Sequence, residues 1–497
     1  MILGIDLGTT YSAAAYLDQN GTPQIVANAE GDKVTPSVVM INGNDVIVGK
    51  NAKRYALQWI DKVFSRVKMQ MGMKGFFKRQ EETSEYRPEE LSAYILKKIV
   101  QDAGKRLNEE ITGVVVTFPA NFQDNQRKAT QDAIKSAGLT EIGMINEPTA
   151  AALYFCYKTH LDQGTVLIYD LGGGTFDATL LSVKGNLIEV LATQGDNTIG
   201  GVYFDDEIVR YVIEQVLEQY GVDLEEDQYQ NVRQEISFYA EDCKKTLSEL
   251  EQASIFMNYG SGPKDVVVTR EEFEGLISKV YKGTESTIRM MMKRKGLKPE
   301  EIDRVFITGG SSRIPYIKKQ LEKLFQRELY YDEDTDNAVA LGAALYGRIC
   351  MQDTADQELS FRDVCSHGIG VLLYDGDAQY NEVIIEPNSK IPTTVDYLCQ
   401  TRFPNQSRIT LTVTQGESKE IEYVNTISVI DIELPGRFPE GTLVNVGISL
   451  DEKQMLHVHV NIPAANVDKE YNLKRLSNLS EEELRDLSGL VAVKSVR

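Results

Sequence analysis

One short pattern occurs twice in this chain, and it restricts the fold more than any other feature of the sequence. Residues 5–10 read Ile-Asp-Leu-Gly-Thr-Thr, and residues 169–175 read Tyr-Asp-Leu-Gly-Gly-Gly-Thr. Each copy begins with apolar residues typical of a buried strand, places an aspartate at the strand end and then turns through glycine and threonine. The repeat predicts two related β-hairpins in two related parts of one fold.

The residue types in these turns suit the binding of a phosphate chain together with a metal ion. Glycine permits a tight turn and exposes backbone N–H groups, and threonine hydroxyls add donors to phosphate oxygens. An aspartate beside phosphate needs a cation, because the two anions otherwise repel each other. Two such turns facing each other across a cleft would hold a nucleoside triphosphate with Mg²⁺. The commonest alternative phosphate loop, Gly-x-x-x-x-Gly-Lys-Ser/Thr, is absent from the sequence.

Length and charge exclude several classes of function. The 497 residues are enough for about two to four domains with ample cores. A formal charge of −21 would repel nucleic acid and anionic lipid, so we expect neither as a partner. We find no signal-peptide pattern and no apolar run long enough to span a membrane, which favours a cytoplasmic protein. Five scattered cysteines without a Cys-x-x-Cys pair predict neither a disulfide framework nor a zinc site.

Strand-like and helical segments alternate from Met1 to about Arg348, which is typical of an α/β architecture. Residues 114–118 read as a buried strand, and residues 122–137 read as a helix that ends before a glycine. The strand-like residues 304–308 lead into a Gly-Gly turn and then a helical pattern from Ile314. This order predicts a helix N-terminus behind a glycine turn, which suits a phosphate or ribose but also occurs in ordinary strand-to-helix connections.

The character of the chain changes after Cys350. A polar and acidic stretch precedes short alternating strands, for example residues 409–413 and 456–462, which predict a β domain with one apolar face per strand. Ser480 and Glu483 form a capping box for a short helix that should end near Gly489. The expected organisation is a nucleotide-binding ATPase domain at 1–350, a linker at 351–364, a β-sandwich at 365–477 and a short helical tail at 478–497.

Four motifs together resemble those of the 70-kDa heat-shock chaperones of the DnaK type, within the wider actin, hexokinase and sugar-kinase superfamily. They lie at residues 4–10, at 145–153 (Ile-Asn-Glu-Pro-Thr-Ala-Ala-Ala-Leu), at 170–177 and at 309–315, and the similarity runs from Met1 to about Leu476. The resemblance implies an α/β fold with a two-lobed, actin-like ATPase domain whose sheets are duplicated, followed by a peptide-binding β-sandwich.

The resemblance also implies a set of residues around ATP or ADP, Mg²⁺ and, as a further candidate, K⁺. Lys68 and Glu147 would hold the water that attacks the terminal phosphoryl group, with Lys74 as a rival for Lys68. Asp177 and Thr175 complete the catalytic candidates. Asp6, Asp170 and Asp177 would surround the metal ion and its waters. The phosphates would be held by Gly8, Thr9, Thr10, Tyr11, Gly172, Gly173, Gly174 and Thr175.

The adenosine side is predicted from a helical stripe and two glycine pairs. Positions i, i+3, i+4 and i+7 of one helix face are Glu241, Lys244, Lys245 and Ser248, which resemble the adenosine-binding helix of the family, although a solvated charged face gives the same pattern. The remaining cofactor candidates are Gly200, Gly201, Gly309, Gly310, Ser311, Arg313 and Asp336. Tyr11 stands where much of the family has asparagine.

The β domain resembles the peptide-binding sandwich of the family. The resemblance implies a cleft for extended apolar peptide, lined by Ile369, Leu372, Cys399, Ile409 and Leu411. The same residues could instead form the core of the sandwich. Expected partners are unfolded or extended polypeptide clients, a J-domain co-chaperone and a nucleotide exchange factor. Two departures bear on coupling between the domains: the long helical lid is missing, and the linker Leu359-Ser-Phe-Arg-Asp-Val364 is polar where the family has leucines.

Three functions fit these observations. The first is an ATP-hydrolysing chaperone that binds unfolded polypeptide without a full lid. The second is a small-molecule kinase of the same superfamily, which the β domain and the pair of Lys68 and Glu147 disfavour. The third is a nucleotide-bound regulatory scaffold with one dedicated partner, which the altered linker favours.

Overall fold

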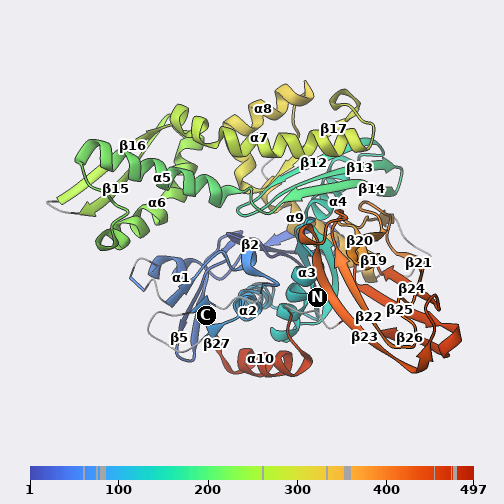
Figure 1. The fold of residues 1–497 in the computed structure, drawn as a ribbon. Coiled ribbons are helices and arrows are strands. Elements are labelled where there is room, and N and C mark those ends of the chain that lie inside the picture. The colour runs from blue at the N-terminus through green and yellow to red at the C-terminus, as the bar shows by residue number, and fades with distance from the viewer. Residues whose placement is uncertain are drawn as a thin grey trace.

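The computed structural model shows two α/β lobes and a β-sandwich that lies beside both of them (Figure 1). It describes every residue except 57, 60–61, 74–76, 79–84, 260–261, 332–333, 352–359, 453, 472 and 474–477. The predicted fold class is confirmed, since both lobes carry mixed sheets covered by helices and the later part of the chain is almost entirely strand.

The first lobe is built around the first copy of the repeated pattern. Its main strands are β1 (Ile2–Asp6), β2 (Tyr11–Leu17), β3 (Pro23–Val26), β10 (Gly113–Phe118) and β11 (Glu141–Asn146). They are ordered β11-β10-β1-β2-β3, with β1 to β3 antiparallel and β10 and β11 parallel to β1. This strand order can be compared directly with that of the sheet that carries the second copy of the pattern.

The second lobe repeats this arrangement. Its strands are β12 (Gln163–Leu171), β13 (Phe176–Lys184), β14 (Leu187–Asp196), β17 (Arg304–Thr308) and β18 (Ser360–Arg362). They are ordered β17-β12-β13-β14-β18, with β12 to β14 antiparallel and β17 parallel to β12. The order β17-β12-β13-β14 reproduces β10-β1-β2-β3, so the predicted duplication of the sheet is confirmed.

Two helices, α4 (Glu147–Thr159) and α9 (Ala338–Met351), lie in the core between the two sheets. Their contacts are apolar: Ala13 and Val115 of the first sheet and Ile168 and Leu181 of the second share one buried cluster with these helices. Close packing here depends on small residues, because a Cβ on Gly342 of α9 would strike the backbone of Ala150 in α4. The outer helices are α2 (Pro88–Leu107), α3 (Asp124–Ser136), α5 (Gly201–Tyr220), α6 (Gln230–Glu249), α7 (Arg270–Arg294) and α8 (Pro315–Phe325).

Each lobe carries an extension. In the second lobe, α6 is followed by the hairpin β15 (Gln252–Tyr259) and β16 (Gly262–Thr269). The extension of the first lobe comprises β4 (Thr35–Pro36), β5 (Val39–Asn42), β6 (Asp45–Val48), α1 (Lys50–Tyr55), β7 (Val63–Phe64), a 3₁₀ helix (Val67–Gln70), β8 (Phe77–Lys78) and β9 (Glu85–Tyr86).

The β-sandwich consists of two four-stranded sheets around one apolar core. One sheet has the order β20-β19-β22-β23 and the other β21-β24-β25-β26. Their bounds are β19 (Ile369–Asp375), β20 (Ala378–Ile385), β21 (Thr393–Gln400), β22 (Gln406–Gln415), β23 (Asn425–Phe438), β24 (Leu443–Leu450), β25 (Leu456–Ile462) and β26 (Val467–Tyr471). The alternation predicted for 409–413 and 456–462 falls within β22 and β25.

Both ends of the sandwich connect to the lobes. At its start, β18 pairs in parallel with β14 of the second lobe. At its end, the chain returns to the first lobe as α10 (Glu481–Val493) and β27 (Ser495–Val496), and β27 pairs in parallel with β6. The capping box of Ser480 and Glu483 is confirmed, but the helix does not end near Gly489. It continues to Val493 because Leu487 and Val491 pack into the core of the first lobe.

Two further expectations need correction. The helix predicted at 122–137 is shorter, since Phe122 lies before the Gln123 cap and is buried in the lobe core instead. The glycine turn at 309–310 does not lead straight into α8, because residues 310–313 form a separate 3₁₀ turn and α8 begins at Pro315. Within the described part of the chain, none of the helices combines the length and apolar character that a membrane crossing requires.

Candidate functional site

The two repeated turns meet face to face. One joins β1 to β2 and the other joins β12 to β13, so each lies at the end of the strand that carries its aspartate. A Cβ added to Gly173 would collide with the Thr10 hydroxyl, and one added to Gly174 would lie 2.8 Å from Thr9 Oγ1. The bare backbone of the second turn therefore fits against the side chains of the first.

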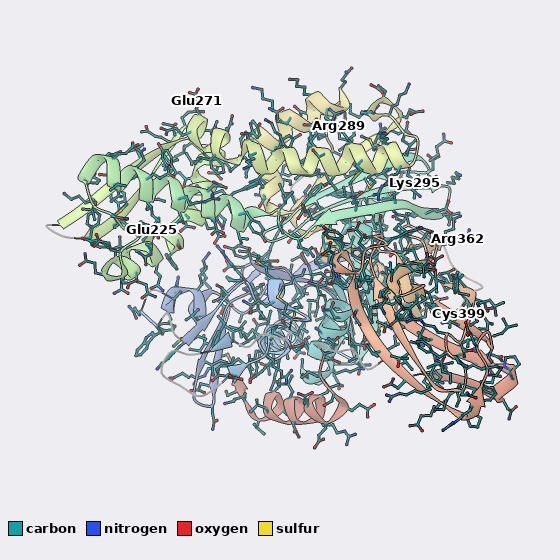
Figure 2. All side chains as sticks on the ribbon, viewed as in Figure 1. Glu225, Glu271, Arg289, Lys295, Arg362 and Cys399 are labelled. Atoms are coloured by element: carbon teal, nitrogen blue, oxygen red, sulfur yellow. The ribbon has the colours of Figure 1, made fainter. Side chains whose placement is uncertain are left out.

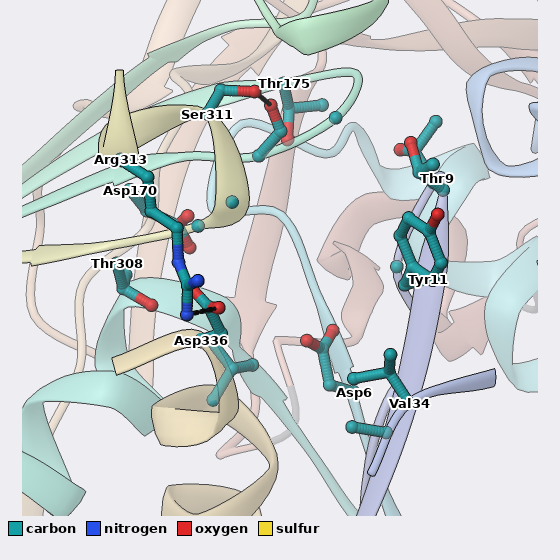
Figure 3. A pocket seen from close by; sticks show the side chains of 18 of the residues that line it. Asp6, Thr9, Tyr11, Val34, Asp170, Thr175, Thr308, Ser311, Arg313 and Asp336 are labelled. Atoms are coloured by element: carbon teal, nitrogen blue, oxygen red, sulfur yellow. Dashed lines mark hydrogen bonds and ion pairs between the residues drawn. The ribbon is translucent and has the colours of Figure 1, made fainter. Parts of the chain in front are cut away.

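A cavity of about 490 Å³ opens between the lobes at these turns (Figure 3). Figure 3 shows Asp6, Thr9 and Tyr11 on one side of it, and the second-lobe residues, among them Asp170 and Thr175, opposite. Most of the predicted nucleotide-site residues line it: Asp6, Gly8, Thr9, Thr10, Tyr11, Lys68, Glu147, Asp170, Gly172, Gly173, Thr175, Glu241, Lys244, Lys245, Ser248, Gly309, Gly310, Ser311, Arg313 and Asp336.

Four predicted residues stand behind the cavity wall. They are Gly174, Asp177, Gly200 and Gly201, which do not line it. The two glycines at 200 and 201 begin α5 against the second turn, where a Cβ on Gly200 would lie 2.7 Å from the backbone of Gly174. Because these two glycines have no side chains, the N-terminus of α5 and the second turn can pack closely. Lys74, the rival of Lys68, lies outside the described residues.

Lys68 and Glu147 form an ion pair at the floor of the cavity. Lys68 lies in the 3₁₀ helix after β7, and Glu147 is the first residue of α4, where its carboxylate also faces the helix N-terminus. Their exposed fractions are only 6% and 8%. A buried charge pair of this kind costs desolvation energy and is weak evidence for a stabilising role, so its position in the cavity points to chemistry.

Three aspartates surround this pair and accumulate negative charge. Burial and the nearby Glu147 raise the pKa of Asp6 to about 7, partly opposed by Lys68. The same two causes raise the pKa of Asp177 to about 8, although the Asn121 N–H donates to its Oδ1 at 3.1 Å. Burial and the charges of Glu147, Asp177 and Asp6 raise the pKa of Asp170 well above its ordinary value. A bound cation would stabilise the ionised form of these three carboxylates, because its positive charge would offset their mutual repulsion.

The donor set fits a hydrated divalent cation. Within the described part of the chain, no three acidic, histidine or cysteine side chains converge closely enough to coordinate one ion directly. Mg²⁺ keeps several of its waters and is usually bound through few carboxylates together with phosphate oxygens. Asp6, Asp170 and Asp177 would therefore hold Mg²⁺ largely through its water ligands.

The second lobe contributes a polar wall on the side of α8. The Arg313 guanidinium donates to Asp336 at 3.0 Å, and the Ser311 hydroxyl donates to the Gly172 carbonyl at 2.9 Å. Gly309 has a φ of +83°, and a Cβ there would strike the backbone of Leu171, so only glycine suits this turn. Val34, Ile314 and Val339 supply apolar surface in the same cavity.

Two residues of the predicted stripe on α6, Lys244 and Glu241, make different kinds of contact. Lys244 is buried and turns away from solvent, with its Nζ 2.7 Å from both the Gly201 carbonyl and Asp205. Glu241 instead reaches across the cleft to the first lobe. Its carboxylate accepts hydrogen bonds from Lys53 at 2.6 Å and from the Tyr11 hydroxyl at 3.0 Å.

This contact between the lobes explains what Tyr11 does. Its hydroxyl accepts from Lys245 at 2.9 Å and from Lys53 at 3.2 Å, and Lys245 also lies 4.7 Å above the ring centroid. Although burial opposes it, the two lysines lower the pKa of Glu241 to about 2. Lys53 was missed in the sequence, because α1 carries no motif and its partner is far away in the chain.

The predicted peptide-binding residues lie in the sandwich and differ in environment. Ile369 and Leu411 are buried in its core, which agrees with the alternative that they serve packing. Leu372, Cys399 and Ile409 are only half-buried. Figure 2 shows Cys399 on the sandwich, below Arg362 of the linker strand β18.

A family model described as Hsp70 protein matches residues 2–491. The match covers both lobes, the linker, the sandwich and most of α10, and so extends past Leu476, where the resemblance in the sequence was predicted to end.

Proposed function

The chain belongs to the Hsp70 family, and from this premise we propose that it binds and hydrolyses ATP in the cleft between its lobes to control the binding of extended polypeptide by its sandwich. ATP-dependent chaperone activity is the general property of the family. The proposal assigns it to particular residues of this chain and treats the hydrolysis as slow and stimulated by partners.

The main support for the proposal is that the two repeated glycine and threonine turns meet at a cavity that also contains the buried ion pair of Lys68 and Glu147. The backbone N–H group of Gly173 and the hydroxyls of Thr9, Thr10 and Thr175 would bind the phosphates, which would fix the terminal phosphoryl group over this pair. Mg²⁺, when bound, would neutralise charge on the phosphate oxygens.

Lys68 and Glu147 have complementary tasks. The Lys68 ammonium offsets negative charge that gathers on the phosphoryl oxygens, and the Glu147 carboxylate orients the attacking water and accepts its hydrogen bond. Their mutual ion pair holds both side chains in one geometry before the nucleotide arrives. Preorganised groups of this kind typically contribute about 100-fold or more to a rate.

The partner side of the proposal rests on the sandwich. Extended peptide would gain affinity from backbone hydrogen bonds and selectivity from apolar pockets, for which the half-buried Leu372, Cys399 and Ile409 are the candidates. A J-domain co-chaperone, an exchange factor and a cytoplasmic location complete the proposal, the last supported by five cysteines that show no disulfide pattern.

Single-turnover hydrolysis of prebound ATP tests the proposal. Lys68→Ala and Glu147→Ala should each lower the rate by about 100-fold or more, whereas Lys50→Ala, an exposed lysine paired with Asp32, should leave it unchanged. An extended apolar peptide should stimulate the wild type. Transfer of the phosphoryl group to a metabolite would support the kinase instead, and tight nucleotide binding without hydrolysis would support the scaffold.

A further inference from the structure

Residues 478–497, the tail, follow the sandwich in the chain but lie on the first lobe. The helix α10 packs against α2 and α3 of this lobe. Its residues Leu487 and Val491 belong to the same buried apolar cluster as Leu3 of β1 and Val114 of β10. The sandwich has a separate core of its own. By its packing, the tail is therefore a part of the first lobe.

The strand β27 completes a sheet of the same lobe. It pairs in parallel with β6 and so extends the order β27-β6-β5-β7. The Arg497 N–H donates to the Val46 carbonyl at 2.9 Å, and the Val48 N–H donates to the Arg497 carbonyl at 2.9 Å. Without β27, β6 would be an edge strand with unpaired backbone groups. The tail thus satisfies the backbone of the lobe as well as its apolar core.

Charged side chains of the lobe hold α10 at both of its ends. Near its N-terminus, Arg87 pairs with Glu483 at 2.6 Å. At its C-terminus, the Lys97 ammonium donates to three carbonyl groups, the closest being that of Val491 at 2.8 Å. A cation in this position suits the partial negative charge of a helix C-terminus. Because Arg87 caps α2 and Lys97 lies within it, one helix of the lobe fixes the tail at two points.

The contacts of the sandwich with the lobes are of another kind and include a series of hydrogen bonds by polar side chains. The Asp124 N–H donates to the Gln415 side chain at 3.0 Å, and the Thr193 N–H donates to the Asn388 side chain at 2.8 Å. Further polar contacts are those of Asp363 with Asn146 and Gln454, of Lys390 with Glu189, and of Arg294 with Glu417. Water can replace such hydrogen bonds when the sandwich moves away, whereas a detached tail would expose apolar surface.

We propose that the tail is a fixed part of the ATPase domain, so that the sandwich is inserted between two segments of this domain and stays held at both ends when it separates from the lobes. The other end is held by β18, which pairs with β14 of the second lobe. The sandwich can then change its orientation, but the tail does not leave the first lobe with it. The inference goes beyond the proposed function and does not require hydrolysis.

Hydrogen exchange of four backbone amides in the full-length protein tests this inference. The amides of Val48 and Arg497 report the attachment of the tail, because they form the hydrogen bonds between β6 and β27. The amides of Asp124 and Thr193 report the docking of the sandwich, because each donates to one of its side chains. The two kinds of attachment are thus measured separately in one sample.

A double variant loosens the docking of the sandwich without touching the tail. It combines Gln415→Ala with Asn388→Gly, since glycine suits the φ of +61° at position 388. The matched control is Lys390→Ala, which removes an ion pair on the surface of the sandwich, with the lysine side chain 65% exposed. Should the double variant fail to fold, Q415A alone replaces it.

In the double variant, exchange of the Asp124 and Thr193 amides should rise at least about tenfold. Exchange of the Val48 and Arg497 amides should stay within about twofold of the wild type, and K390A should match the wild type at all four positions. A rise at Val48 and Arg497 as large as that at Asp124 and Thr193 would refute the inference, because the tail would then leave together with the sandwich.

Cleavage of the chain gives a second measurement. After digestion of a protease site inserted behind Leu473, the tail should co-elute with the rest of the protein in size-exclusion chromatography, in the double variant as in the wild type. Separate elution of the tail would contradict the inference. Neither measurement uses hydrolysis, so an inactive wild type would refute the proposed ATPase without affecting this result.

Discussion

The two lobes carry the same hairpin but use it differently. The first turn presents the hydroxyls of Thr9 and Thr10 and leads into the Tyr11 side chain, whereas the second turn presents the bare backbone of residues 172–174 before Thr175. The aromatic residue after each turn differs in the same sense: Tyr11 reaches across the cleft to Glu241, while Phe176 is fully buried and packs against Tyr169 with ring centroids 5.0 Å apart. The two duplicated sheets support the hairpins in the same way, and the functional difference between the lobes lies in the residues of the turns.

This difference teaches why the turns cannot be exchanged. A side chain at position 173 or 174 would have no space, since these two glycines already lie against Thr10 and Thr9. The neighbouring Gly172 is unlike the other two, because a Cβ there would meet its nearest atom at an ordinary 3.6 Å. Glycine is thus required by the opposite lobe at some positions and not at others.

The largest effect is expected from Gly173→Ala. Its Cβ would collide with the Thr10 hydroxyl and push the turns apart, so ATP affinity should fall by at least about 100-fold, a loss of roughly 3 kcal/mol. Gly172→Ala is the matched control and should cost less than about fivefold. Isothermal titration with ATP and Mg²⁺ measures both, and equal affinities for the two variants would show that the turns do not constrain each other.

The second prediction uses the aspartates of the two hairpins. A carboxylate whose pKa is raised on folding stabilises the protein below its unfolded value near 3.8, and this stability is lost as pH rises through the folded value. Between pH 5 and 8 the unfolding free energy of the nucleotide-free protein should therefore fall as Asp6 and Asp177 ionise, by up to about 1.4 kcal/mol per pH unit for each group below its folded pKa of about 7 or 8. Urea unfolding at each pH measures this loss.

Asp6→Asn is the control for that prediction, because it keeps the shape and removes the ionisation. It should flatten the profile up to about pH 7, while Asp170→Asn should flatten it at higher pH as well, since the pKa of Asp170 is raised further. Mg²⁺ with ADP should restore stability at pH 8. An unchanged slope in both variants would mean that the buried carboxylates do not govern stability.

The third prediction concerns the side chain by which the first hairpin reaches across the cleft. Tyr11→Phe removes the hydroxyl that contacts Glu241, Lys53 and Lys245 but keeps the ring. The direct ion pairs of Glu241 remain, so we expect a moderate effect: nucleotide release about tenfold faster, with the hydrolysis rate of prebound ATP unchanged. Stopped-flow release of a fluorescent nucleotide measures it, and a slower release would contradict a bridging role for Tyr11.

The sequence predicted what depends on local pattern and failed where contacts join distant segments. The repeated motif identified both hairpins because a strand, an aspartate and a glycine turn are adjacent in the chain. The Lys53 contact with Glu241 joins residues 188 positions apart without any motif. Only the folded arrangement of α1 opposite α6 brings the two charges together.

The end of α10 shows a different reason for failure. Gly489 is a reasonable helix terminator from sequence, yet it lies within the helix with open space around it, where it costs only about 1 kcal/mol. Burial of Leu487 and Val491 on either side of it offsets that cost. Tertiary packing thus decides a boundary that propensity alone would place four residues earlier.

The smallest effect is expected at this chain end, where the lobes differ once more: the first holds the tail and the second holds the linker strand. The carbonyl of Arg497 accepts from the Val48 N–H at 2.9 Å, so exchange of this amide reports detachment of the tail. Val491→Ala removes a side chain only 1% exposed and should weaken the attachment by about 1 kcal/mol, raising amide exchange at Val48 about fivefold. Val493, 78% exposed, is the matched control, and its alanine variant should exchange like the wild type. Because neither valine reaches the cleft, ATP affinity should not change in either variant. A loss of ATP affinity in V491A together with faster exchange would show that attachment of the tail affects nucleotide binding by the first hairpin and does not only stabilise the first lobe.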